Sequence, residues 1–429
     1  MESGDAAWVL ASAALVLFMT PGLAFFYGGM DRSRNVLNML MMNFWCLLIV
    51  PVVWVVVAYS IAGGNADASW FGGFDAAFLD GIGITGEDGG MGLLTIAFLG
   101  MFAVITPALI SGAVADRMKF SAWALFAPVW VILVFAPIFK WVYGGWLGQR
   151  GSLDFAGGTA IHVNAGIAAL VAVLILGKRR GWPSEGHPPH SMPLVMIGTG
   201  ILWFGWFGFN AGSALAANGQ AVQAFMNTFV AAAAAGLAWA LVERVKDGHF
   251  TNLGAASGIV AGLVAITPAA GFVTTMPSIV IGLAAGAICC LAVQLKFKAG
   301  YDDALDVVGV HFVGGLVGSL MIGLFADPAY FGADHMEGLF LGGGLDLLFE
   351  QALANVAAIV WSGAVTAVML LVLKATIGIR VSEEVEASGL DTAEHAETAY
   401  NYGDVSMGRP GAGAGAPSTT TGARDVLVG

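Results

Sequence analysis

Eleven long apolar segments dominate this chain of 429 residues and limit what it can fold into. A helix needs about 20 apolar residues to cross the hydrocarbon core of a bilayer, where backbone groups must satisfy one another. Charged residues make up 11% of the chain, against about 25% in soluble domains. The sequence therefore predicts an all-α polytopic membrane protein. The predicted spans are 6–30, 35–61, 91–114, 120–147, 157–177, 193–216, 221–242, 252–271, 276–295, 308–326 and 350–377.

Basic residues follow every second span, and this alternation predicts the orientation of the chain. Arg32 and Arg34 follow the first span, whereas the loop 62–90 is acidic and contains no Lys or Arg. Loops rich in Lys and Arg face the cytoplasm. We therefore expect the N-terminus outside and the C-terminus in the cytoplasm, which requires an odd number of spans. The net charge of −12 then belongs to outer loops and the tail, so it indicates no nucleic-acid partner.

Two sequence matches indicate an internal repeat. The Ile-Thr-Pro-Ala sequence of residues 105–108 recurs at 266–269, and the segments around His162 and His311 are related by a similar offset. Both matches pair a span with the span five further on, and five crossings reverse the direction of the chain. The pattern predicts a transmembrane domain over 1–377 with inverted halves at about 6–177 and 193–326, the substrate path between them and an extra helix at 350–377.

His162 and His311 are the main candidate functional residues. Each lies in a long apolar run and has a carboxylate upstream, Asp154 or Asp306. A polar side chain at membrane depth needs hydrogen-bonding partners. The ordinary interpretation is a pair of satisfied core histidines, but their recurrence in equivalent spans favours one shared polar feature. Asp154 fits either a helix N-cap or a buried anion that attracts cations.

Aromatic side chains gather on two helix faces in the predicted outer half of the membrane. Trp206, Phe209 and Ser213 are spaced i, i+3, i+7 and share one face, and Phe98 and Phe102 at i, i+4 share another. Aromatic faces attract a partly dehydrated cation, and a serine hydroxyl can accept a hydrogen bond. Core packing is the alternative interpretation of the same spacing.

A metal site has weaker support. The two histidines and Asp154 could form a 2-His-1-carboxylate set in a membrane metalloenzyme, but no predicted span contains an His-x-x-x-His pair. The cysteines Cys46, Cys289 and Cys290 lie in or beside apolar spans, so no disulfide framework is indicated. We expect neither a metal nor a cofactor.

At these residues the chain resembles the ammonium transporter family (Amt/Rh), in its bacterial Amt type. The segments that carry the resemblance are 154–179, 205–213 and 306–311, and the match extends from the first span to about residue 402. The resemblance implies an eleven-helix protomer with a five-plus-five inverted repeat, assembled as a homotrimer in the lipid of the cell membrane with one pore per protomer. It also implies a transporter of ammonium or ammonia rather than an enzyme.

The resemblance assigns a role to each candidate side chain. The implied roles are a gate at Phe102 and Phe209, an outer recruitment site at Phe98, Tyr143, Trp206 and Ser213, a supporting carboxylate at Asp154, and pore histidines at His162 and His311. This chain has Tyr143 where the family usually has Trp, and Lys140 adds a cation nearby. Tyr is the weaker cation–π face, so we expect lower apparent affinity or a different recruitment geometry.

The expected mechanism recruits ammonium at the outer site, removes its proton at the Phe gate and conducts ammonia past the histidines, with the proton transferred separately. The alternatives are a passive Rh-type channel for neutral ammonia or carbon dioxide, an ammonium sensor, and the metalloenzyme. Residues 378–402 resemble the family's cytoplasmic regulatory segment, which meets PII-type signalling proteins. Residues 403–429 are of low complexity and are predicted to be disordered.

Overall fold

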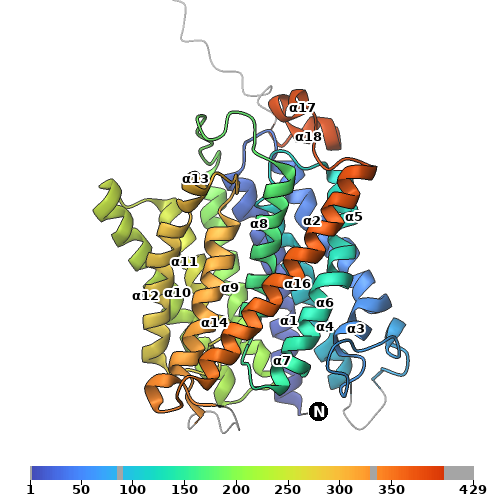
Figure 1. Ribbon diagram of the computed structural model, residues 1–429, viewed down its shortest axis with the longest axis vertical. Helices are drawn as coiled ribbons and strands as arrows, with labels where there is room; N and C mark the ends of the chain where they lie inside the picture. Colours follow the sequence, from blue (N-terminus) through green and yellow to red (C-terminus); the bar gives the residue numbers. More distant parts are fainter. Residues whose placement is uncertain (1, 85–89, 329–335, 401–429) are drawn as a thin grey trace, which may run out of the picture.

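The computed structural model describes residues 2–84, 90–328 and 336–400. Over these residues the chain is helical without a β-strand, and Met118 and Arg380 form an isolated bridge. Figure 1 shows the helices packed side by side in one bundle. The predicted all-α membrane fold is confirmed. The predicted disordered tail, 403–429, lies outside the described residues.

The helices follow the order of the predicted spans. The first half contains α1 (Ser3–Met30), α2 (Val36–Val53), η1 (Trp54–Ala58), α3 (Tyr59–Gly63), η2 (Ala77–Leu79), α4 (Met91–Ser111), α5 (Phe120–Trp130), η3 (Val131–Phe135), α6 (Ala136–Val142), α7 (Trp146–Gln149), η4 (Gly158–Val163) and α8 (Asn164–Leu176). The second half contains α9 (Met192–Ala211), η5 (Gly212–Ala214), α10 (Gly219–Asp247), α11 (Asn252–Ile266), α12 (Thr275–Ala292), α13 (Leu295–Ala299), η6 (Val308–Phe312) and α14 (Val313–Phe325). They are followed by η7 (Leu339–Leu341), α16 (Asp346–Thr376), α17 (Glu383–Ser388) and α18 (Leu390–His395).

Ten of the helical segments in the described part of the chain are long and apolar enough to cross a membrane. The remaining predicted span, 252–271, is shorter than expected, because α11 ends at Ile266 after 15 residues. Beyond that end the backbone turns, and the carbonyl of Pro268 accepts a hydrogen bond from the N–H of Phe155 at 3.0 Å. Fifteen helical residues rise about 22 Å, so the total of eleven crossings stays a prediction.

Four π-helical turns interrupt the described spans, and two of them carry the histidines. η1 and η3 each begin three residues after a proline, Pro51 or Pro128, whose missing N–H and ring bulk disturb the regular ladder. η4 contains His162 and η6 contains His311, and each continues into a helix of 13 residues. The two histidine segments therefore have the same local structure, and the inverted repeat stays a prediction. Single π-turns inside helices often mark functional sites.

The two termini of the described chain lie at opposite ends of the bundle. In Figure 1 the N-terminus lies near α7, whereas α17 and α18 lie beyond the other end, above α2 and α5. We refer to these as the N-terminal end and the C-terminal end of the bundle. This arrangement agrees with termini on opposite sides of a membrane.

Candidate functional site

A cavity of about 280 Å³ lies among α3, α4, α6 and η5, toward the N-terminal end of the bundle. It collects four of the residues expected at an outer recruitment site and gate: Phe98, Phe102, Tyr143 and Ser213. The hydroxyl of Ser213 donates to the carbonyl of Phe209 at 2.8 Å, so its oxygen can still accept a hydrogen bond from a bound molecule. The cavity thus combines aromatic faces with one oriented acceptor.

Two phenylalanines separate this cavity from the histidines. Phe102 lines the cavity and packs on Phe209, with ring centroids 4.4 Å apart and planes inclined by 37°. On its other side the ring of Phe209 lies 6.1 Å from the imidazole of His162. The ring contacts therefore run from the cavity through Phe102 and Phe209 to His162.

His162 and His311 meet inside the bundle. Their rings are nearly parallel, with centroids 5.3 Å apart, and their Nδ1 atoms are separated by 3.3 Å. One of these nitrogens must carry the hydrogen and the other must accept it. Nε2 of His162 is buried and has no hydrogen-bond partner among the described residues. Leaving a buried polar group unpaired costs about 1–3 kcal/mol, so a polar molecule that supplied the missing bond would be favoured there.

Trp206 lies deeper than we expected from the sequence. Its indole stacks on His162 at 5.5 Å, and its Nε1 donates to the hydroxyl of Thr267 at 2.8 Å. It is not among the residues that line the cavity. The reason is helical rise: seven residues separate Trp206 from Ser213, or about 10 Å along α9 and η5. Sharing a helix face did not place the two side chains in one site.

Asp154 caps the turn that carries His162. Its Oδ1 accepts from the N–H groups of Gly157 and Gly158, and its Oδ2 accepts from those of Thr159 and Ala160, at 2.7–3.0 Å. Four backbone donors thus occupy a carboxylate that is 8% exposed. Asp154 therefore satisfies the first backbone donors of the turn, as a capping carboxylate does, although the N-cap position itself is Gly157. Within the described residues no cluster of three or more His, Cys, Asp or Glu is placed to hold a metal ion.

A second carboxylate, Asp303, caps the turn that carries His311, and we did not predict it. Asp303 accepts from the N–H groups of Val307 and Val308 at 3.1 and 2.7 Å. Asp306, the upstream acid noted in the sequence, instead pairs with Lys296 at 2.6 Å. A signal was available, because Asp303 precedes His311 by eight residues, as Asp154 precedes His162. Burial raises the pKa of Asp303 to about 6, against the lowering effect of Lys296.

Lys140 is turned away from the cavity. Its ammonium group donates to the carbonyls of Asn65 and Ala66 at 2.7 and 3.3 Å, and the residue is buried. Although Tyr143 lines the cavity, Lys140 is absent from its lining. The cation that we expected beside the recruitment site therefore fastens the loop that follows α3.

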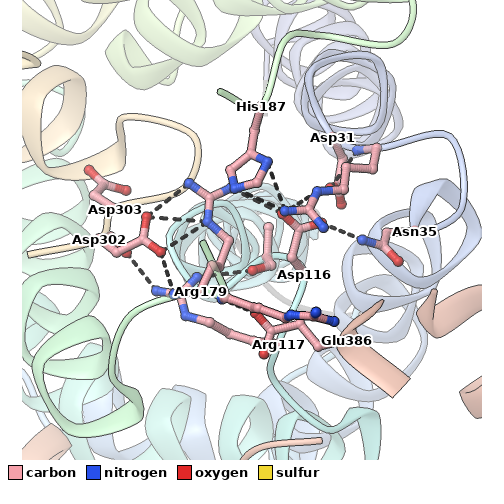
Figure 2. A network of polar contacts seen from close by, with 12 residues as sticks. Asp31, Asn35, Asp116, Arg117, Arg179, His187, Asp302, Asp303 and Glu386 are labelled. Atoms are coloured by element: carbon pink, nitrogen blue, oxygen red, sulfur yellow. Dashed lines mark hydrogen bonds and ion pairs between the residues drawn. The ribbon is translucent and has the colours of Figure 1, made fainter. Parts of the chain in front are cut away.

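A buried ionic network fastens the C-terminal end of the bundle (Figure 2). Arg179 lies at its centre, paired with Asp302 at 2.8 Å and with Asp116 at 3.0 Å. Although burial raises the pKa of Asp302, the hydrogen bonds from Arg179 bring it below its ordinary value. The three residues come from the loops after α4, α8 and α13, so the network joins segments that are distant in sequence.

Three carboxylates of residues 378–400 bind the same end of the bundle. Glu386 accepts from the backbone N–H of Arg180 at 2.6 Å. Asp391 accepts from the N–H of Asn38 at 2.8 Å, and Glu394 from the N–H of Phe120 at 3.1 Å. The last two donors lie in the first turns of α2 and α5, where the helix dipole favours an anion. The segment is thus bound through the first turns of two helices and through one loop N–H.

Comparisons with known proteins find relatives that match along most of the chain. The family model described as "Ammonium Transporter Family" matches residues 7–400. The chain is 50% identical to an ammonium transporter of Mycobacterium tuberculosis, over 94% of this chain and 91% of that protein. It is also 50% identical to one of Aquifex aeolicus, over 94% of each. Among solved structures, a "Sensor Amt Protein" superposes with a TM-score of 0.85 at 28% identity, over 91% of this chain and 98% of that one. Candida albicans Mep2 superposes with a TM-score of 0.83 at 33% identity, over 90% and 87%.

Proposed function

The chain belongs to the ammonium transporter family, and from this membership we propose a path by which it moves ammonium across the cell membrane. Its relatives are named ammonium transporters, so the chain is a multi-pass membrane transporter rather than an enzyme. The observation that carries the proposal is the unbroken series of contacts from the cavity through Phe102 and Phe209 to the two histidines.

Ammonium enters this path at the aromatic cavity. The ring faces of Phe98 and Tyr143 attract a cation, and the oxygen of Ser213 accepts one of its hydrogen bonds. Asp154 adds no direct contact, because its oxygens are occupied by backbone donors. Its part is to hold the turn of His162 in place.

Beyond the cavity, burial favours the neutral form of the substrate. Taking a charge out of water raises its free energy, so ammonium transfers its proton to Nε2 of His162 on entering the apolar region behind Phe102 and Phe209. The Nδ1 hydrogen of His162 then passes to Nδ1 of His311. Neutral ammonia can then bond to Nε2 of His162, which has no partner among the described residues. The shared hydrogen between the two Nδ1 atoms gives the separated proton a route from one imidazole to the other.

Reconstituted protein tests this path. In proteoliposomes on a solid-supported membrane, the double variant His162→Ala with His311→Ala should lower the saturable ammonium current about tenfold or more, the equivalent of one lost hydrogen bond. It should also lose preference for ammonium over potassium. His249→Ala, which removes an exposed histidine between α10 and α11, is the matched control and should retain both properties.

Two results would contradict the proposed path. An unchanged saturable current in the double-histidine variant would rule out the relay. Uptake of ammonia by the unaltered protein without any current under a membrane potential would instead indicate a passive neutral-gas channel.

We further propose that the N-terminal end faces outward and the C-terminal end faces the cytoplasm. Arg117 and Arg179 lie together at the C-terminal end (Figure 2), and Arg32 lies 3.6 Å from Asp116 in the same network, which is the distribution that the positive-inside rule predicts for a cytoplasmic face. On this orientation residues 378–402 form a cytoplasmic regulatory segment, of which the structure describes 378–400. We propose that this segment meets a PII-type signalling protein and that the chain works as a homotrimer, as its family resemblance implies.

A further inference from the structure

A buried polar cluster on α16 ties together the two segments that carry the histidines. Gln351 and Asn355 lie one helical turn apart on the same face of α16, and both are almost completely buried. Thr159 of η4 and Ser319 of α14 complete the cluster. None of the four lines the cavity or hydrogen-bonds to a histidine, so any effect on transport must be transmitted through the backbone.

Gln351 holds the segment that precedes the cap of the His162 turn. Its amide oxygen accepts from the N–H of Leu153 at 2.7 Å, and its amide nitrogen donates to the carbonyl of Leu153 at 2.8 Å. The same nitrogen donates to the carbonyl of Ser319 at 3.0 Å. Because Leu153 immediately precedes Asp154, one side chain fixes the backbone beside that carboxylate and the backbone of α14.

Asn355 joins the two histidine segments directly. Its amide nitrogen donates to the hydroxyl of Ser319 at 2.9 Å, and its oxygen accepts from the hydroxyl of Thr159 at 3.0 Å. The two hydroxyls are themselves 3.2 Å apart. Thr159 precedes His162 by three residues in the same π-turn, and Ser319 follows His311 by eight in the helix that continues its turn.

We infer that Gln351 and Asn355 are positioning residues that set the distance and orientation between His162 and His311. A satisfied polar network in apolar surroundings favours one arrangement of the elements that it joins. The predicted inverted repeat ends before α16, so two symmetric halves alone would lack these bonds. The inference rests on the proposed function, in which the histidine pair serves the substrate.

Variants of nearly equal volume test the inference in the full-length protein. Gln351→Leu should lower the ammonium current per folded molecule by about tenfold or more, because a displacement of ~1 Å at a reacting pair can cost up to a hundredfold. Preference for ammonium over potassium should fall with it. Gln351→Glu, whose neutral carboxyl keeps one acceptor and one donor, should restore most of both.

Thr366→Val is the matched control on the same helix. The hydroxyl of Thr366 is buried and accepts from the indole of Trp130 at 2.9 Å. Its loss removes a buried hydrogen bond that does not involve the histidine segments. Current and selectivity should therefore be retained, and an equal loss in this variant would overturn the inference.

A double-mutant cycle separates positioning from general damage. If Gln351 acts through the histidines, Gln351→Leu should leave unchanged the residual ammonium current of the variant His162→Ala with His311→Ala. Additive losses would overturn the inference and leave the proposed function standing. An undiminished current in the double-histidine variant by itself would overturn the proposed function. If Gln351→Leu is not recovered as folded protein, Asn355→Leu replaces it in the double-mutant cycle. The same outcomes then support or overturn the inference.

Discussion

At the scale of single residues, the direction in which a side chain points matters as much as its residue type. Lys140 and Tyr143 lie three positions apart, yet the tyrosine lines the cavity while the ammonium group of the lysine is bound by two backbone carbonyls. A cation held in this way is a structural element of the loop that follows α3. Its charge is therefore a poor guide to the affinity for ammonium.

Paired variants test this distinction. Lys140→Met should lower the free energy of unfolding in detergent by about 1–3 kcal/mol, because two backbone carbonyls lose their hydrogen-bond donor. Its apparent affinity for ammonium should change less than about threefold, because the ammonium group does not line the cavity and is bound by two backbone carbonyls. Tyr143→Ala, by contrast, removes a cation–π face and should weaken the affinity by about tenfold. A tighter affinity in Lys140→Met would show that the lysine repels the substrate after all; current–concentration curves provide the measurement.

At the scale of elements, two capped π-turns form the core of the site. Asp154 accepts four backbone donors at the start of η4, and Asp303 accepts two at the start of η6. In each case the carboxylate stands eight residues before its histidine. The geometry of each imidazole thus depends on a carboxylate that it does not touch.

The pKa of Asp303 predicts how the stability of its element varies with pH. Burial raises this pKa from its ordinary 3.8 to about 6, so between these values the folded state binds a proton that the unfolded state does not. The contribution of Asp303 is therefore fully present below about pH 4 and is lost as the pH rises through 6. Relative to Asp303→Asn, the unaltered protein should gain up to about 3 kcal/mol between pH 7 and pH 4. Thermal unfolding of both proteins across this range is the check, and parallel profiles would contradict it.

At the scale of the whole molecule, ion pairs between segments that are distant in sequence join the loops at the C-terminal end of the bundle. Arg179 pairs with Asp116 and Asp302 inside the bundle (Figure 2), and the buried carboxylate of Glu386 accepts from Arg380 and from the backbone N–H of Arg180. Residues 378–400 are therefore attached to the loops that join the transmembrane helices at this end. A partner that displaced the segment would act on those loops as well.

Glu386→Leu tests this attachment. The substitution removes two charge-assisted bonds from a buried carboxylate, each worth about 1.5–3 kcal/mol. Residues 378–400 should then be cleaved faster in limited proteolysis, while the transmembrane bundle stays intact. Glu383→Leu, an exposed neighbour on α17, is the control and should leave the cleavage rate unchanged. Equal rates for all three proteins would mean that Glu386 does not hold the segment.

Sequence alone determined the membrane class, the limits of most helices, the histidine pair and the family, because apolar length and local motifs are properties of contiguous residues. Tertiary structure decided that Trp206 stacks on His162, that Lys140 points away from the cavity, and that Asp303 rather than Asp306 caps the second turn. It also brought Gln351 and Asn355 to the histidine segments. These contacts depend on the depth and rotation of each helix against its neighbours. Interhelical packing sets both, and no single stretch of sequence encodes it.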